Sequence, residues 1–184
     1  MAKIVLPLRG GPPPEPPFGG LGEAGWVRGF TFYDFVQRAE QHRAELESAF
    51  RECPLPAAVV ASLASFPRQV RVLALLDAGD PASCRFIARA ERVFTHSARI
   101  WMRVFDAPAC ADLVARYAPQ GKDLPVLVFF GEDQQEFARH RLSDIVPAAT
   151  DIEPGSPGSA AKAEALALVH ALHLSLATYA ASAS

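Results

Sequence analysis

Residues Val70 to Cys84 read V-R-V-L-A-L-L-D-A-G-D-P-A-S-C, and this stretch decides the fold. The run from Val70 to Leu76 is rich in valine and leucine and is bounded by polar and breaker residues, which predicts a strand buried on both faces. Asp80 and Pro81 are the residue types of a helix N-cap and a first helical position. The stretch therefore predicts a strand that stops at Gly79 and restarts as a helix, with Cys84 in or near its first turn.

The following segments repeat this alternation. The first helix is expected to run to about His96, with an apolar face formed by Phe86, Ile87, Ala90, Val93 and Phe94. A second strand is predicted from Ile100 to Phe105, and a second helix from Asp106 and Pro108 to Tyr117. A right-handed crossover makes two such strands parallel, so the class is α/β.

The C-terminal third predicts a hairpin and a last helix. Pro125 to Phe130 is a strongly apolar strand, and residues 135–141 follow the polar turn 131–134 as a less buried antiparallel edge strand. Residues 143–159 form a connection that contains proline and glycine. Residues 160–181 return as a helix with one apolar stripe made of Ala165, Leu168, Val169, Leu172, Leu176 and Tyr179.

The N-terminal region divides into a leader, residues 1–29, and the start of a folded domain, residues 30–184. Residues 10–29 hold seven of the twelve glycines, and five prolines surround Glu15, so an extended leader is expected. The tract P-P-P-E-P-P is either a polyproline ligand or a simple arm. Trp26 and Phe30 are expected to fix its end to the domain. A capped helix is predicted from Thr31 to before Pro54, and a shorter one over residues 57–65.

Composition narrows the partners and the compartment. A net charge of −2 gives no overall attraction to nucleic acid or to an anionic membrane. The three cysteines, Cys53, Cys84 and Cys110, contain no C-x-x-C pair and favour a reducing cytoplasm. Residues 165–184 carry no formal charge, but they are rich in alanine and serine and contain two histidines, so a membrane helix is not favoured.

Two motifs in this order of elements resemble the thioredoxin family. The sequence L-L-D-A-G-D-P stands where active members of some bacterial branches carry Trp-Cys-Gly-Asp or Trp-Cys-Gly-Pro, and D-L-P-V-L-V-F-F-G-E-D is similar to their segment that begins with a cis-proline. The likeness covers about residues 31–181. It implies a thioredoxin-like three-layer α/β/α sandwich with a mixed central sheet, an N-terminal helical extension and a Pro/Gly-rich leader. It also implies that Pro125 is cis and shapes a peptide-binding face.

The dithiol of that family is missing here. Matching Gly79 and Asp80 to the family motif puts Ala78 at the nucleophilic cysteine, and counting back from Pro125 puts Pro81 there and Cys84 at the second position. Disulfide exchange needs an attacking thiolate and a resolving thiol within bonding distance. Both alignments therefore argue against disulfide reductase activity.

Cys84 is the candidate catalytic residue. A helix start, Arg85 and Arg89 are all expected to lower its pKa; the alternative is an inert, buried thiol. Asp77 is either a proton acceptor near this thiol or the residue that begins a turn. Cys53 and Cys110 are interpreted as packing or surface thiols. The candidate binding face comprises Asp77, Ala78, Gly79, Asp80, Pro81, Ser83, Leu124 and Pro125.

Other polar groups give weaker signals. His170 and His173 have a spacing that could supply two metal ligands, but that helix offers no further ligand beside them, so solvated or core-edge histidines are favoured. Arg85, Arg89 and Arg92 on the helix, with Arg99 and Arg103 on the next strand, are either an anion-binding patch or a solvated face. No phosphate-binding loop and no dinucleotide motif is present, and we predict neither a cofactor nor a metal.

Three functions are consistent with these patterns. The first is a cytoplasmic interaction module that binds a protein partner through Gly79 to Cys84 and Pro125. The second is a monothiol redox protein in which Cys84 forms a mixed disulfide with a small thiol or a partner protein. The third is an assembly component whose proline-rich arm and uncharged last helix bind another subunit or a second copy of the chain.

Overall fold

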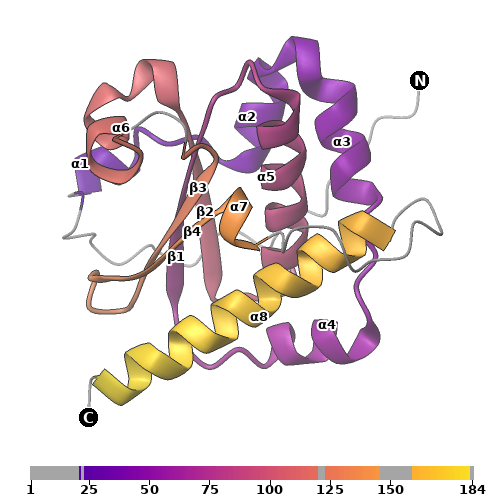
Figure 1. The fold of residues 1–184 in the computed structure, drawn as a ribbon, viewed down its shortest axis with the longest axis vertical. Coiled ribbons are helices and arrows are strands. Elements are labelled where there is room, and N and C mark those ends of the chain that lie inside the picture. The colour runs from indigo at the N-terminus through magenta and orange to yellow at the C-terminus, as the bar shows by residue number, and fades with distance from the viewer. Residues whose placement is uncertain (1–20, 22, 120–122, 146–158, 183–184) are drawn as a thin grey trace.

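A four-stranded mixed sheet lies at the centre of the molecule (Figure 1). The computed structural model describes residues 21, 23–119, 123–145 and 159–182. The strand order is β2-β1-β3-β4, in which β1 (Val70–Leu76) runs parallel to β2 (Ile100–Asp106). Strand β3 (Val126–Phe130) is antiparallel to β1 and to β4 (Glu136–Arg141). The predicted parallel pair and the predicted hairpin are both present.

Strand β1 carries the core of the fold because it is buried along its whole length, as predicted. Successive side chains of a strand point to opposite faces of the sheet. Accordingly, Val72, Ala74 and Leu76 belong to one apolar core, whereas Leu73 and Leu75 belong to the other. Each of the two cores therefore packs against a different set of helices.

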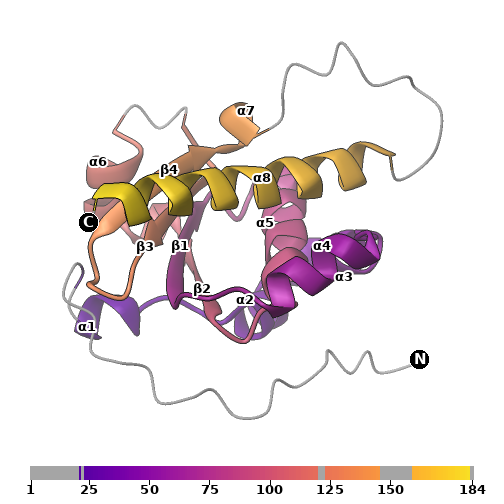
Figure 2. The same cartoon turned by 90° about the horizontal axis from the view of Figure 1, so that it is seen from below.

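Helices cover both faces of the sheet, so the architecture has three layers (Figure 2). The smaller core contains Trp26 of α1 (Glu23–Trp26) and Leu113 and Tyr117 of α6 (Ala111–Tyr117). The larger core lies under α2 (Phe32–Arg38), α3 (Arg43–Arg51), α4 (Ala57–Ala64), α5 (Pro81–Phe94), α7 (Leu142–Ile145) and α8 (Ser159–Ser182). The chain has a mixed α/β fold, and α8 crosses the face that α5 also covers (Figure 1).

Two helices differ from the sequence-based prediction. One is interrupted, and the other begins later than predicted. The helix expected from Thr31 is capped there, since Thr31 Oγ1 accepts a hydrogen bond from the Asp34 amide at 3.1 Å. It then breaks into α2, a 3-10 turn (Glu40–His42) and α3, because Ala39 leaves the helical region with ψ near 60°. The helix after β2 starts at Ala111, because Pro108 lies in a separate 3-10 turn (Ala107–Ala109).

The end of the leader is not extended throughout, which corrects the sequence-based expectation. Residues Glu23–Trp26 form one helical turn, and Trp26 is buried against Phe105 with ring centroids 6.5 Å apart. Phe30 exchanges two backbone hydrogen bonds of 2.8 Å with Val104. Burial of the indole accounts for this local order in a glycine-rich segment. The proline tract lies outside the described residues, as do residues 146–158 of the expected connection.

The described helices include none with the length and apolar character needed to cross a bilayer. Helix α8 spans 24 residues but mixes alanine, serine and histidine with its leucines.

Candidate functional site

The candidate site begins with a turn at the end of β1. The Gly79 amide donates to Asp77 Oδ1 at 2.8 Å, and the Asp80 amide donates to the Asp77 carbonyl at 3.0 Å. The Ala78 amide donates to Asp106 Oδ1 at 3.1 Å, which joins the ends of the two parallel strands. Asp77 is exposed and shapes the turn, so the turn role is confirmed. Asp106 therefore belongs to this site, although the sequence did not predict it as a site residue.

The first turn of α5 is capped as predicted. The Asp80 carboxylate accepts hydrogen bonds from the Ala82 amide (3.2 Å), the Ser83 amide (2.9 Å) and the Ser83 hydroxyl (2.5 Å). The hydroxyl bond from Ser83 is the main reason that the pKa of Asp80 lies below its ordinary value. Pro81 occupies the first helical position and is exposed, whereas Ser83 is buried. The site therefore presents a turn that its own side chains hold in place.

Pro125 lies beside this turn. The bond between Leu124 and Pro125 is cis, which is the isomer that the family resemblance implies. The next residue, Val126, pairs with Leu75 of β1, so Pro125 is level with the last residue of that strand. The Pro125 carbonyl accepts a hydrogen bond from the Leu142 amide at 3.2 Å. The structure thus brings together the two sequence segments that define the candidate face.

Cys84 is fully buried beneath the turn, with its Sγ 3.6 Å from the Ala78 carbonyl oxygen. Burial raises the pKa of Cys84 to about 11, and the nearby carboxylates of Asp80 and Glu45 add to the rise. The expectation that Arg85 and Arg89 lower this pKa is wrong. Desolvation outweighs the helix N-terminus here, and each arginine faces a carboxylate of its own.

The other two thiols are also buried and unpaired. Cys53 shares the larger core with Cys84, but Cys110 lies in the smaller core on the opposite face of the sheet. Burial raises the pKa of both Cys53 and Cys110. The sheet therefore separates Cys84 from Cys110.

The arginines of α5 are paired with acidic or aromatic side chains, so they form neither a free anion-binding patch nor a purely solvated face. Arg85 is ion-paired with Glu45 of α3, and Arg89 Nη1 lies 2.6 Å from Glu164 Oε2 of α8. The Arg92 guanidinium lies 5.6 Å from the centre of the Phe50 ring. The sequence did not predict that Glu45 and Glu164 would be partners of these arginines. Glu164 gave a usable signal, because it adjoins the apolar stripe of α8 at Ala161, Ala165 and Leu168.

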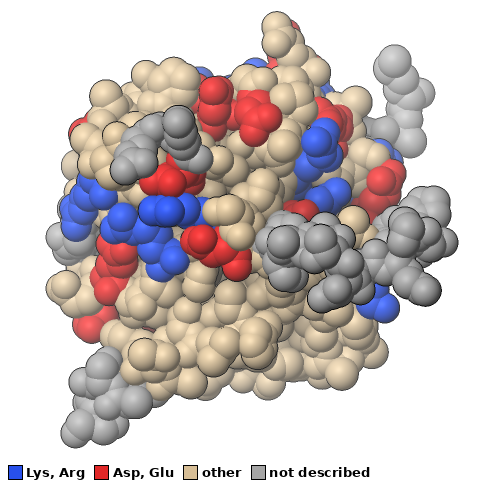
Figure 3. Space-filling view, in the orientation of Figure 1, with Lys and Arg blue, Asp and Glu red and all other residues tan. Residues whose placement is uncertain are grey.

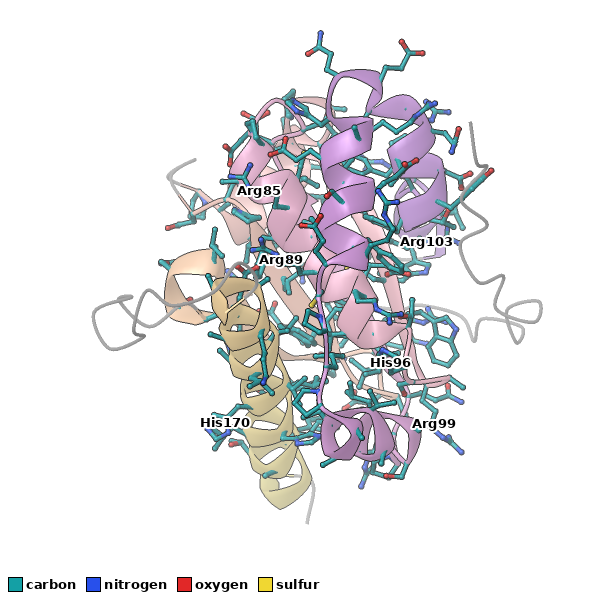
Figure 4. All side chains as sticks on the ribbon, turned by 90° about the vertical axis from the view of Figure 1, so that its right-hand side faces the viewer. Arg85, Arg89, His96, Arg99, Arg103 and His170 are labelled. Atoms are coloured by element: carbon teal, nitrogen blue, oxygen red, sulfur yellow. The ribbon has the colours of Figure 1, made fainter. Side chains whose placement is uncertain are left out.

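Arg85 and Arg89 line a surface pocket next to the candidate face (Figure 4). Figure 4 shows both side chains emerging from α5, with Arg89 close to α8. The other lining residues are Ala82 and Phe86 of α5, Leu142 and Ser143 of α7, and Glu164 of α8. Ala82 belongs to the first turn of α5, so the pocket adjoins the turn that follows β1.

The histidines of α8 have separate roles. His173 stacks on Phe66 with ring centroids 6.1 Å apart and contacts Ser62 Oγ at 3.5 Å, which ties α8 to α4 and its following loop. His170 is exposed. Within the described part of the chain, no three histidine, cysteine or acidic side chains come together as a metal site. Arg99 is exposed, and Arg103 reaches the Gly29 carbonyl at 3.4 Å, so these two arginines do not extend the cluster on α5.

Charge is unevenly distributed over the surface. Figure 3 shows basic and acidic side chains in the upper half, whereas the lower part, where α4 and the end of α8 lie, is almost entirely uncharged. The sequence agrees, since residues 53–67 and 165–184 contain no Asp, Glu, Lys or Arg. The candidate face and its arginine pocket lie outside this uncharged region.

No family model and no curated protein matches this chain. Among solved structures, it is similar to a protein of unknown function from Pseudomonas aeruginosa, with 21% identity and a TM-score of 0.59 over 87% of this chain and 98% of the other. It is also similar to an HIV epitope-scaffold, with 20% identity and a TM-score of 0.60 over 83% of this chain and 93% of the other. At this level of identity the likeness concerns the fold alone.

Proposed function

We propose that this chain is a thioredoxin-like domain that binds an extended segment of a partner protein and does not exchange disulfides. The observation that carries the proposal is the cis Pro125, itself buried, beside the turn Asp77 to Asp80, in which Asp77 and Gly79 are exposed. In the thioredoxin family, a proline at this place shapes the peptide-binding face. The strand order and directions support the same assignment. A cytoplasmic location belongs to the proposal, since all three cysteines are unpaired.

The chemistry of the turn supports binding over redox catalysis. The mixed-disulfide alternative needs a thiolate that a partner can reach. Cys84 is completely buried, and its pKa of about 11 leaves little thiolate at neutral pH. The positions aligned with the nucleophile in the family, Ala78 or Pro81, have no thiol.

The exposed groups of the turn suit an extended peptide. Gly79 has no side chain and is exposed, which allows the backbone of a ligand to approach closely. Pro81 is exposed, and Ala78 and Leu124 are half-buried, so they offer small apolar contacts. Because the Asp80 carboxylate is engaged with the start of α5, the turn keeps its shape while the ligand binds.

Peptide selection tests this proposal. Random peptides displayed on phage are selected against the purified full chain, and the bound peptides are titrated while its amide NMR signals are recorded. We expect the largest shifts at Asp77 to Ser83 and at Leu124 to Val126. A Gly79→Trp variant should weaken binding by about tenfold or more, because an indole there blocks the approach. An added Cβ at Gly79 would lie 3.2 Å from Asp77 Oδ1, so the Asp77 carboxylate must shift by a few tenths of an ångström to admit the side chain.

The matched control is Ala98→Trp, at an exposed position before β2, at the opposite end of the sheet. It should bind the selected peptides like the unmodified chain. Equal binding by the Gly79→Trp variant, shifts confined to another surface, or no selected peptide at all would each refute the proposed face.

A further inference from the structure

A second surface pocket, separate from the one that Arg85 and Arg89 line, lies where β4, α7 and α8 meet. Its volume is about 340 Å³, which is the size of a small-ligand site. Strand β4 contributes one lining residue, α7 two and α8 five: His140; Asp144 and Ile145; Ala167, His170, Ala171, Leu174 and Ser175. Three elements that are separate in the sequence therefore build one concave site.

The lining carries one formal charge, and that charge is negative. Asp144 is exposed, and its Oδ2 accepts a hydrogen bond from the Arg141 amide at 3.0 Å. The Arg141 guanidinium pairs instead with Asp123 Oδ1 at 3.2 Å. None of the described lining residues is a lysine or an arginine. A carboxylate without a cation among its neighbours in the lining attracts a cationic ligand and repels an anionic one.

The other polar side chains of the pocket can accept hydrogen bonds. His140 Nε2 lies 3.0 Å from Ser175 Oγ, and the His140 ring packs on Phe129 with ring centroids 5.7 Å apart. Burial lowers the pKa of His140, although the Asp144 carboxylate opposes the shift, so this imidazole is uncharged at neutral pH. Whichever ring nitrogen carries the proton, Ser175 Oγ keeps a lone pair for a ligand. His170 is exposed, and Figure 4 shows its side chain extending outward from α8.

Apolar side chains form the rest of the walls. Ala167 and Ala171 are half-buried, Ile145 is buried, and Leu174 is 55% exposed. A short alkyl chain that covers Leu174 removes apolar surface from water, which favours binding. The pocket therefore combines a carboxylate and neutral acceptors with an apolar wall.

We propose that this pocket binds a primary alkylammonium group. Such a group has three N–H donors and no acceptor, and the Asp144 carboxylate, Ser175 Oγ and a ring nitrogen of His170 supply the acceptors. Its methylene groups pack on Leu174. A small free amine and the side chain of a lysine both offer this chemistry. The inference does not rest on the proposed peptide-binding face, because no residue of that face lines the pocket.

Three probes of similar size test the charge preference on the full chain. The amine n-butylamine, the alcohol n-butanol and the anion butyrate are titrated at neutral pH while amide NMR shifts are followed at His140, Asp144 and Ser175. We expect saturable shifts with n-butylamine in roughly the millimolar range, as befits a small fragment, and at least about tenfold weaker binding of the other two. Equal or tighter binding of butyrate or n-butanol overturns the inference. So does the absence of saturation with all three probes.

The variant Asp144→Asn isolates the carboxylate. An asparagine oxygen can still accept from the Arg141 amide, so the contact is kept while the pocket loses its charge. This variant should bind n-butylamine about tenfold more weakly. Asp34→Asn makes the same change at an exposed position of α2, outside the pocket, and should leave binding unchanged. If circular dichroism shows that Asp144→Asn is unfolded, His170→Leu replaces it, because it removes another acceptor. Unchanged binding in the folded variant overturns the inference.

A fourth probe identifies the source of the ammonium group. N-acetyllysine methylamide carries the same group on a peptide backbone. Binding as tight as that of n-butylamine would support the pocket and assign it to a lysine side chain of a partner. Binding at least about tenfold weaker than that of n-butylamine would support the pocket and assign it to a free amine.

Discussion

Helices α5 and α6 begin at the same end of the sheet, each after one of the two parallel strands. The sequences that lead into them are alike. Strand β1 exits through D-A-G-D-P-A-S-C and β2 through D-A-P-A-C, so each exit has an Asp-Ala pair, a proline and a cysteine. The two exits are joined by the hydrogen bond from the Ala78 amide to Asp106. Their first helical turns are nevertheless stabilised in different ways.

The start of α5 has a side-chain cap from its own N-cap residue, whereas the start of α6 has none and pairs with a distant segment. Asp80 caps α5 with its side chain. At α6 the N-cap residue is Cys110, which makes no capping side-chain bond, and Arg28 reaches Asp112 at 2.9 Å instead. That ion pair is exposed, so water screens it. The locally capped turn is the one that presents the candidate face, which is consistent with a rigid binding site.

The largest expected difference between the two segments is the reactivity of their cysteines, Cys84 after β1 and Cys110 after β2. Burial raises the pKa of Cys84 to about 11, so little of it is thiolate at neutral pH, and it has no solvent exposure. Cys110 is 7% exposed and lies near the cationic Arg28. We expect iodoacetamide to modify Cys110 well before Cys84 in the folded protein, as measured by mass spectrometry of tryptic peptides.

The single variants Cys84→Ser and Cys110→Ser assign the modified peptides. Modification of Cys84 as fast as a free thiol, with a pH midpoint below 9, would remove the contrast between the two exits. It would also favour the monothiol redox alternative over the binding module.

Loss of the α5 cap should cost more stability than loss of the α6 ion pair. Asp80→Ala removes an acceptor for two backbone amides and for the buried Ser83 hydroxyl, so the free energy of unfolding should fall by about 1–2 kcal/mol. Asp112→Ala should lower it less, because Arg28 and Asp112 are both exposed. Urea unfolding followed by circular dichroism measures both. A larger loss with Asp112→Ala would contradict the comparison.

The same cap has a predictable dependence on pH. The pKa of Asp80 is lowered in the folded state, so its ionised form stabilises the fold above the unfolded value near 3.8. This contribution should disappear as the pH falls from there through the lower, folded pKa. Asp80→Asn keeps a capping oxygen but does not titrate, and it should flatten this part of the stability profile.

Local signals explain what could be predicted from the sequence. The Asp80 and Pro81 pair and the valine and leucine run of β1 lie within one short stretch, and the bounds of β1 agree with the prediction. The start of α6 was placed too early because Asp106 and Pro108 begin a separate 3-10 turn, and the sequence pattern does not distinguish that turn from the first turn of the helix. The pairs of Arg85 with Glu45 and of Arg89 with Glu164 were missed because they join helices that are far apart in the sequence. Local patterns do not report such contacts.

The smallest expected effect concerns Arg28, the cation near Cys110 at the start of α6. Arg28 lowers the pKa of Cys110 but does not reverse the rise that burial causes. Arg28→Met retains much of the side-chain cover and removes the charge, so the pH midpoint of Cys110 alkylation should move upward, while Arg28→Lys should keep it near the original value. Cys84 lies on the opposite face of the sheet, and its midpoint should not change. An equal shift at both thiols would mean that the two exits are coupled through Ala78 and Asp106, and that α5 is not held by its own residues alone.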